Sequence, residues 1–184
     1  MKITQTKLEG CFIVKPQIFK DERGYFFESY NFQRFKEATG IDLLFMQDNQ
    51  AKSQYGVIRG LHLQRKPSLQ TKFLRVLEGE ILDVAVDVRK DSPTYGQHVA
   101  VELSAENNLQ LYIPHGFAHG YSVLSETAVV AYKCDAFYDK DAEDGIYLFD
   151  EDLNIDWGIP KDKAILSEKD LNQKLFSDFK AVEL

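Results

Sequence analysis

Residues 81–88, Ile-Leu-Asp-Val-Ala-Val-Asp-Val, place two kinds of side chain alternately along the chain. Asp83 and Asp87 fall on one face, and the other face holds only branched aliphatic residues: Leu82, Val84, Val86 and Val88. Because successive side chains of a strand point to opposite sides of a sheet, this period of two predicts a β-strand. The sequence Glu78-Gly-Glu80 predicts a turn from a preceding strand at residues 71–77.

More segments have the same short strand character: residues 97–103, 109–113, 120–124 and 128–134. Short strands at regular spacing are typical of a sandwich or a barrel. We therefore expect an all-β protein, built as an antiparallel jelly roll.

Helix signals are few and lie outside these strands. Asn31 is a suitable N-cap for a short segment that Gly40 would end, with one apolar face formed by Phe32, Phe35 and Ala38. Ser167-Glu-Lys-Asp170 has the form of a capping box, which predicts a short C-terminal helix. These additions would be peripheral to the jelly roll.

Composition limits the possible partners and compartments. A length of 184 residues fits one domain, residues 1–184, and a net charge of −7 makes a broad nucleic-acid surface unexpected. No apolar run approaches the ~20 residues of a membrane helix, and the N-terminus lacks the pattern of a signal peptide. Cys11 and Cys134 are far apart in sequence, so we expect free thiols and a cytoplasmic protein.

Two histidines lie in segments that resemble the metal-binding motifs of cupin barrels. His119 ends the pattern Pro-x-Gly-x-x-His, whereas His62 is followed two positions later by Gln64 instead of a second histidine. Zinc or iron requires three or four N, O or S ligands, and two imidazoles with an amide are a poor set. We therefore expect a cupin-like barrel without a metal or other cofactor, whose activity survives chelation and which performs proton transfer.

Arg59 stands three residues before His62, so a regular strand would place the two side chains on opposite faces. Gly60 lies between them and suits a β-bulge, which would turn both side chains into one cavity. A lone histidine on a strand is usually a structural residue, and these neighbours favour a functional one. Gln64 shares the face of His62.

Lys72 and Tyr132 each allow two interpretations. Lys72 is either a solvated lysine at a strand end or a cation that faces a developing oxyanion. Alternation along residues 128–134 places Tyr132 with Val130 and Cys134, pointing inward, where it is either a core tyrosine or a proton donor.

Polar residues near the N-terminus suggest a ligand with phosphate groups. Arg23 lies in a polar turn that leads into an aromatic strand, and together with Arg59 it would suit a diphosphate. Gln47-Asp48-Asn49 offers amides that suit a base or sugar edge, although such triplets commonly form turns.

Several segments, in order over nearly the whole chain, resemble the dTDP-4-dehydrorhamnose 3,5-epimerase family. They are Phe19-Lys-Asp-Glu-Arg-Gly-Tyr-Phe-Phe-Glu28, Gln47-Asp-Asn49, Gly56-Val-Ile-Arg-Gly-Leu-His62, Ser92-Pro-Thr-Tyr-Gly96, Ile113-Pro-His-Gly-Phe-Ala-His-Gly120, Ala131-Tyr-Lys133 and Leu166-Ser-Glu-Lys-Asp170. The departure is Ala51, where this family more often has a hydroxyl residue.

The resemblance implies His62 as catalytic base, Tyr132 as the acid on the opposite face of the sugar, Lys72 near the C4 oxygen and Asp170 as the residue that orients His62. Asp170 also belongs to the predicted capping box, and the sequence leaves open whether one carboxylate serves both. A dTDP-sugar substrate and a homodimer that shares N-terminal strands are implied as well. The implied ligand contacts are Arg23, Glu28, Gln47, Asp48, Asn49, Arg59, His119, Glu143 and Lys169.

The expected reaction is epimerisation at C3 and C5 of dTDP-4-dehydro-6-deoxyglucose through an enolate, which needs no nicotinamide. The sequence leaves three alternatives open. A sibling enzyme would epimerise C3 only or isomerise the ketone. A metal-dependent cupin enzyme and a sugar-binding jelly roll without catalysis are the other two.

Overall fold

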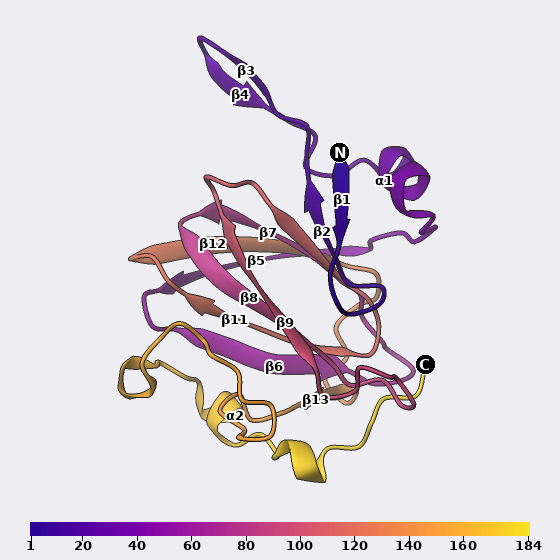
Figure 1. The fold of residues 1–184 in the computed structure, drawn as a ribbon, viewed down its shortest axis with the longest axis vertical. Coiled ribbons are helices and arrows are strands. Elements are labelled where there is room, and N and C mark those ends of the chain that lie inside the picture. Colours follow the sequence, from indigo (N-terminus) through magenta and orange to yellow (C-terminus); the bar gives the residue numbers. More distant parts are fainter.

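The computed structural model describes residues 1–184 as two antiparallel sheets packed face to face, with a small hairpin apart from them (Figure 1). The six-stranded sheet has the order β1 (Lys2–Gln5), β2 (Phe12–Lys15), β10 (Gln110–Ile113), β7 (Lys72–Glu78), β12 (Thr127–Cys134) and β5 (Gln47–Gln54). The five-stranded sheet has the order β13 (Glu143–Gly145), β6 (Ile58–Gln64), β11 (Phe117–Val123), β8 (Glu80–Asp87) and β9 (His98–Ser104). The expected antiparallel jelly roll is confirmed.

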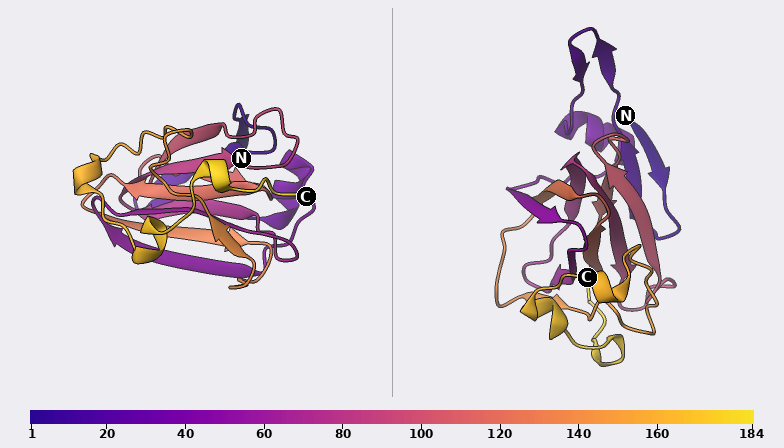
Figure 2. Two further views of the ribbon diagram at one scale, coloured as in Figure 1. Left: turned by 90° about the horizontal axis from the view of Figure 1, so that it is seen from below. Right: turned by 90° about the vertical axis from the view of Figure 1, so that its left-hand side faces the viewer.

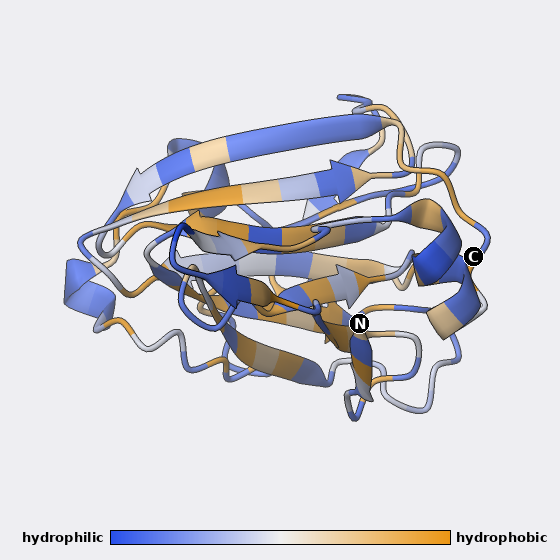
Figure 3. Cartoon of the chain, turned by 90° about the horizontal axis from the view of Figure 1, so that it is seen from above, coloured by the Kyte–Doolittle hydropathy of each residue, from blue (hydrophilic) through white to orange (hydrophobic).

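The strands predicted from alternation all form, within a few residues at each end. In β8, Ile81 and Ala85 pack in the core between the sheets, whereas Val84 and Val86 pack on the opposite face. Both faces of this strand are therefore buried, and Asp83 lies on the face that points between the sheets. Hydrophobic and hydrophilic residues alternate along many strands (Figure 3).

Three apolar clusters hold the layers together. The first fills the space between the sheets and includes Leu74, Leu111 and Val130. The second, with Trp157 and Leu148, lies between the five-stranded sheet and the C-terminal part of the chain. The third covers the outer face of the six-stranded sheet, where Phe35 packs on aromatic residues of the strands.

Phe35 belongs to α1 (Phe32–Thr39), the predicted N-terminal helix. The Asn31 side chain accepts a hydrogen bond from the Arg34 backbone N–H, and Gly40 ends the helix at a φ of 75°. Both cap positions are those predicted from the sequence. No helix in the chain has the length and apolar character needed to cross a membrane.

Residues 161–184 form a segment that we call the C-terminal strap. It contains η1 (Lys161–Lys163), α2 (Glu168–Leu171) and η2 (Phe176–Asp178), and it runs along the five-stranded sheet (Figure 1). Three isolated bridges attach it to the body: Val57 with Ile165, Ile146 with Lys174, and Arg89 with Val182. The strap therefore has fixed positions at both ends and in the middle.

A hairpin near the N-terminus projects away from both sheets (Figures 1 and 2). This N-terminal arm consists of β3 (Phe19–Asp21) and β4 (Gly24–Phe26), and Arg23 lies in its turn as predicted. Phe26 is 67% exposed, and Phe19 and Tyr25 are also largely exposed. Exposed aromatic residues on a projecting hairpin are typical of a surface that another chain covers.

Asp87, at the end of β8, is fully buried and organises the loop that follows it. Its carboxylate accepts hydrogen bonds from the Arg89 guanidinium at 2.9 and 2.7 Å, and from the Ser92 and Thr94 hydroxyls at 2.6 Å each. Burial alone would raise the pKa of Asp87, but these donors lower it from 3.8 to about 2. The motif Ser92-Pro-Thr-Tyr-Gly96 thus has a structural role.

Because the folded pKa of Asp87 lies below the unfolded one, its contribution to stability is complete above about pH 4 and is lost as pH falls toward 2. At ~1.4 kcal/mol per pKa unit, the contribution is on the order of 2 kcal/mol. Asp87→Asn should lower Tm by about 4–8 °C at pH 7. It should also flatten the dependence of Tm on pH between 4 and 2.

Thermal unfolding followed by circular dichroism over that pH range tests this expectation. Asp91→Asn, at an exposed position of the same loop, is the matched control and should keep the acid dependence of the unchanged protein. Equal acid dependence in Asp87→Asn and the unchanged protein would contradict the role of Asp87.

Candidate active site

A cavity of about 490 Å³ lies between the two sheets and the C-terminal strap. A smaller cavity of about 170 Å³ shares His62, Lys72 and Tyr132 with it, so we treat the two as one active-site cavity. Seven predicted site residues line the larger part: Arg59, His62, Lys72, His119, Tyr132, Lys169 and Asp170. Gln47, Asn49 and Glu143 line the smaller part.

Arg59 and His62 reach this cavity because β6 is irregular at Gly60. In the pairing of β6 with β11, His62 faces His119 and Arg59 faces Tyr121, so three steps on β6 match two steps on β11. Gly60 has a φ of 133°, and a Cβ atom there would lie 2.5 Å from the Cα atom of Gly120. The predicted break in the strand is confirmed, and only glycine fits it.

His62 and Asp170 form an imidazole–carboxylate pair. The Nε2 atom of His62 donates to Asp170 Oδ1 at 2.6 Å, and the side chains are 27% and 4% exposed. The other oxygen of Asp170 accepts from the Ser167 hydroxyl at 2.8 Å, while the Ser167 oxygen accepts from the Asp170 backbone N–H. One carboxylate therefore serves both the helix cap and His62, which answers the question that the sequence left open.

The charge of Asp170 is well supported at this position. Burial would raise the pKa of its carboxyl group, but hydrogen bonds from His62 and Ser167 hold the pKa below its ordinary value. Asp170 is therefore ionised near neutral pH, and it can stabilise a positive charge on His62. Nδ1 of His62 has no partner in the chain, so the proton-accepting atom is free.

Tyr132 comes from the opposite sheet and packs against the core between the sheets. Burial, together with the nearby Cys134, raises the pKa of its phenol to about 12. The phenol therefore carries its proton at neutral pH. An imidazole from β6 and a protonated phenol from β12 thus face one cavity from its two sides.

Lys72 is the first residue of β7, the strand between β10 and β12 in the six-stranded sheet. It lies directly opposite Cys134 in the pairing of β7 with β12. Burial lowers the pKa of its ammonium group. Lys133 and Lys169 are ion-paired, but Lys72 has no carboxylate within 4.0 Å. Arg59 likewise bonds only to the Ser53 hydroxyl. Both side chains are therefore free to meet an anion in the cavity.

His119 makes a second pair of the same kind. Its Nε2 atom donates to Asp83 Oδ1 at 2.6 Å, and both side chains are buried. Burial lowers the pKa of His119, with Asp83 acting in the opposite direction. Asp83 was not predicted as a site residue from the sequence. A carboxylate in a strand as apolar as β8 could have indicated a functional role.

Polar side chains at the cavity mouth are bonded to one another. Lys169 forms an ion pair with Glu143, which also accepts from the Tyr138 hydroxyl at 2.9 Å. Gln47 donates to Asn49 at 2.9 Å and accepts from the Tyr138 backbone N–H at 3.0 Å. Tyr138 therefore belongs to the site, and no sequence pattern had singled it out.

Gln64 occupies the position at which a cupin motif would have a metal ligand. Both the nitrogen and the oxygen of its amide form hydrogen bonds with loop backbone. Its nitrogen donates to the Ser68 carbonyl at 2.8 Å, and its oxygen accepts from the Asp139 backbone N–H at 2.7 Å. The amide therefore joins two loops. No three His, Cys, Asp or Glu side chains are grouped so that they could hold a metal ion.

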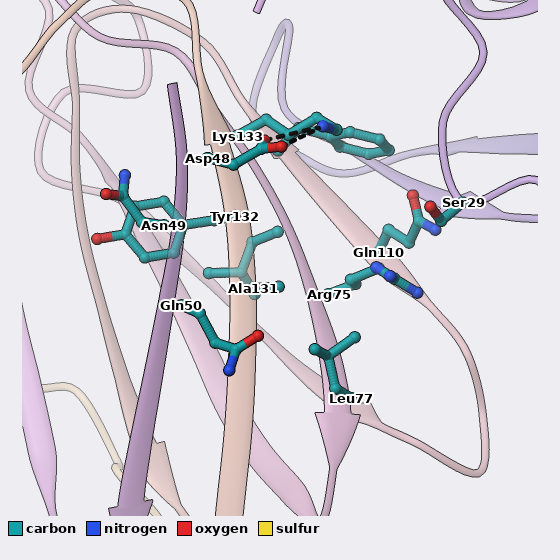
Figure 4. Close-up of a pocket in the computed structure, with 12 residues that line it drawn as sticks. Ser29, Asp48, Asn49, Gln50, Arg75, Leu77, Gln110, Ala131, Tyr132 and Lys133 are labelled. Atoms are coloured by element: carbon teal, nitrogen blue, oxygen red, sulfur yellow. Dashed lines mark hydrogen bonds and ion pairs between the residues drawn. The ribbon is translucent and has the colours of Figure 1, made fainter. Parts of the chain in front are cut away.

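Three predicted ligand contacts lie outside the cavity of their own chain. Arg23, 84% exposed on the arm, pairs with Asp21, so it does not join Arg59 within one chain. Glu28 pairs with Arg34. Asp48 bonds to Lys133 on the outer face of the sheet, on the other side from Asn49 and Tyr132 (Figure 4). Successive side chains of β5 point to opposite faces of the sheet, so Asp48 points outward while Gln47 and Asn49 point inward.

A sequence profile described as dTDP-4-dehydrorhamnose 3,5-epimerase matches residues 5–178. A protein of that name from Shigella flexneri is 49% identical over 178 residues, which cover 97% of each chain. The crystal structure of such an epimerase from Elizabethkingia anophelis is 54% identical, with a TM-score of 0.93 and 97% of each chain covered. A dTDP-6-deoxy-D-glucose-3,5-epimerase of Legionella pneumophila, solved with dTDP-4-keto-L-rhamnose, is 46% identical with a TM-score of 0.93. That likeness covers 97% of this chain and 94% of the other.

The contact at Gly60 generates a prediction about stability. Gly60→Ala should combine backbone strain of ~1–3 kcal/mol with overpacking of ~1–3 kcal/mol against β11. Gly24→Ala is the matched control, because Gly24 has a similar φ of 126° but nothing within 4 Å of an added Cβ atom. Urea unfolding should show Gly60→Ala to be the less stable variant by ~2 kcal/mol. Equal stabilities would mean that β6 and β11 do not require the glycine for space.

Proposed function

This chain belongs to the dTDP-4-dehydrorhamnose 3,5-epimerase family, and we propose that it inverts C3 and C5 of dTDP-4-dehydro-6-deoxyglucose by acid–base catalysis. The product, dTDP-4-dehydrorhamnose, is the precursor of the L-rhamnose nucleotide. The observation that carries the proposal is the position of His62 and Tyr132. They line one cavity from opposite sheets, with the unpaired cation Lys72 beside them.

His62 acts as the base in this mechanism. The C4 ketone acidifies the hydrogens on C3 and C5, and the free Nδ1 atom of His62 removes one of them as a proton. The imidazolium that forms is stabilised by ionised Asp170, and the electron pair left on carbon becomes an enolate whose negative charge rests on the C4 oxygen. Lys72, which lines the same cavity, stabilises that oxyanion electrostatically.

Tyr132 acts as the acid. A phenol whose pKa is raised to about 12 retains its proton until the enolate carbon takes it from the opposite face, which inverts that centre. The tyrosinate and the imidazolium then return to their starting forms by proton exchange with solvent. Repetition at the second carbon completes the reaction, and no electrons leave the sugar.

The rest of the cavity suits a nucleotide sugar. Arg59 and Lys169 supply positive charge for the diphosphate, and Gln47 and Asn49 supply amides that can donate and accept. The ion pair of Lys169 with Glu143 is partly exposed, so a diphosphate can compete for the ammonium group.

We also propose that the active unit is a homodimer in which each arm completes the site of the partner. Arg23 and Glu28 lie outside the cavity of their own chain, and the arm exposes aromatic residues. The outer face of the six-stranded sheet has a hollow of about 380 Å³ lined by Arg75, Leu77 and Gln110 (Figure 4). Its Gln110 amide nitrogen is buried without a partner, which favours a second copy as the cover.

A single domain and a cytoplasmic location complete the proposal. The C-terminal strap supplies Asp170 to a cavity formed by both sheets, which supports one domain over residues 1–184. Cys11 and Cys134 are buried and free, as in proteins of reducing compartments.

Solvent isotope exchange tests the function. In heavy water, the enzyme should incorporate deuterium at C3 and C5 of dTDP-4-dehydro-6-deoxyglucose and yield the product inverted at both carbons, followed by NMR. Exchange and inversion at C3 alone would identify a C3-only epimerase. His62→Ala should lose exchange at both carbons while it still binds dTDP. Substantial turnover by His62→Ala would remove His62 from the role of base.

Tyr132→Phe separates the two proton transfers. The ring and its packing remain, so stability should fall by no more than ~1 kcal/mol. Exchange at the first carbon should persist with retention, because His62 is intact, while inverted product falls by about 10²–10⁴-fold. Both quantities are measured on one sample by NMR. Inversion at full rate would show that another group or a water molecule is the acid.

Subunit mixing tests the shared arm. Arg23→Ala and His62→Ala homodimers should each be poorly active, but a mixed dimer contains one site with intact His62 and an intact partner arm. Random mixing should therefore restore about a quarter of the full activity. Mixing His62→Ala with Tyr132→Phe is the control and should restore none, because both residues belong to one cavity. No recovery in the first mixture would mean that Arg23 does not act across the dimer.

A further inference from the structure

A second imidazole–carboxylate pair lies beside the one assigned to catalysis. His119 on β11 is directly opposite His62 on β6, and each ring has Nε2 at 2.6 Å from an aspartate oxygen. The two pairs differ in exposure, because the His62 side chain is 27% exposed and that of His119 only 7%. Asp83, the partner of His119, has no part in the mechanism described above.

Asp83 is an unusual residue for its position. It is fully buried on β8, between Ile81 and Ala85, which both belong to the apolar core. Its Oδ2 atom has no hydrogen-bond partner, in contrast to Asp87, whose two oxygens are both bonded. A buried carboxylate oxygen without a partner reduces stability, so packing alone does not account for Asp83.

The neighbourhood of Asp83 contains a further unpartnered group. Tyr121 lies directly opposite Asp83 in the pairing of β11 with β8, and its buried hydroxyl has no partner either. Tyr121 and His119 both line the active-site cavity, and Asp83 lies behind them. Buried polar atoms without a partner call for an explanation other than packing, and a role in the neighbouring site is one.

The chemistry of the pair fixes where the proton on His119 resides. Nε2 lies 2.6 Å from Asp83 Oδ1, and a carboxylate oxygen that accepts this hydrogen bond requires the proton to be on Nε2. Burial lowers the pKa of His119, which favours a neutral ring near pH 7. A neutral imidazole carries one proton, so Nδ1 has a free lone pair. Nδ1 has no partner in the chain and is not among the fully buried unpaired atoms, so it is open to the cavity.

We propose that Asp83 is a positioning residue that holds His119 in the tautomer with Nε2 protonated, so that Nδ1 accepts a hydrogen bond from a hydroxyl group of the bound sugar. The sugar as ligand rests on the proposed function, whereas the tautomer does not. Phosphate oxygens and the enolate oxygen have no proton to donate. The pair of Asp83 and His119 therefore recognises the sugar hydroxyls, and it adds no positive charge beside His62.

The first test uses the unchanged full-length protein with ¹⁵N-labelled histidine. The chain contains four histidines, and His119→Gln identifies the signals of His119. Two-bond ¹H–¹⁵N correlation spectra at pH 7.5 should show Nε2 protonated and Nδ1 unprotonated. A proton on Nδ1, alone or together with one on Nε2, overturns the proposal, and the protonation state itself is measured on the unchanged protein.

The second test is Asp83→Asn. The new amide can donate to Nε2, which moves the ring proton to Nδ1 and removes the acceptor. The expected result is a change of tautomer with a rise in KM of about tenfold, the value of one hydrogen bond, and a smaller change in kcat. Binding of dTDP, which lacks the 4-keto-6-deoxyhexose, should change by less than about twofold. An unchanged tautomer or an unchanged KM overturns the proposal.

Two comparisons separate positioning from a purely structural role. His115 donates to Asp135 at 2.6 Å outside the cavity, so Asp135→Asn should alter the tautomer of His115 without a change in KM. In a His119→Ala background, Asp83→Asn should change KM by less than about twofold, because Asp83 acts through His119. A larger additional loss overturns the assignment. If deuterium exchange fails but the tautomer is as expected, the proposed function is wrong and the assignment of Asp83 stands.

Discussion

The close approach of β6 and β11 at Gly60 and Gly120 is the contact on which the site depends. A Cβ atom at Gly60 would lie 2.5 Å from the Gly120 Cα atom, and one at Gly120 would lie 2.6 Å from the Arg59 carbonyl oxygen. Because neither strand has a side chain there, β6 can hold one extra residue against β11. That irregularity turns Arg59 and His62 into the same cavity and sets His62 opposite His119.

Three buried aspartates show how one residue type serves different purposes in the same fold. Asp87 has every oxygen bonded and stabilises a loop. Asp170 divides its oxygens between a helix cap and His62, so the strap that carries it is joined to the chemistry. Asp83 bonds to His119 and leaves one oxygen unpaired, which reduces stability.

Much of the fold could be predicted from local pattern, and the failures have a common cause. The central strands and the caps at Asn31, Gly40 and Ser167 follow from alternation and from side chains that bond to their own backbone. Strand β5 could not be predicted in this way, because Gln47–Gln54 is almost entirely polar. It is a strand only through its eight residue pairs with β12. Pairing of this kind depends on a segment about eighty residues away, which no local pattern contains.

The sequence by itself determined the chemical groups of the site: an imidazole, a phenol, a lysine and an amide in the place of a metal ligand. It also determined the break at Gly60, because only glycine permits that backbone. The tertiary structure alone decided which groups meet. It brought Asp170 from the strap to His62 across 108 residues, joined Asp83 to His119, and kept Arg23 away from Arg59. The physical reason is that periodicity gives the face of a strand, whereas the partner on that face depends on how sheets and strap pack.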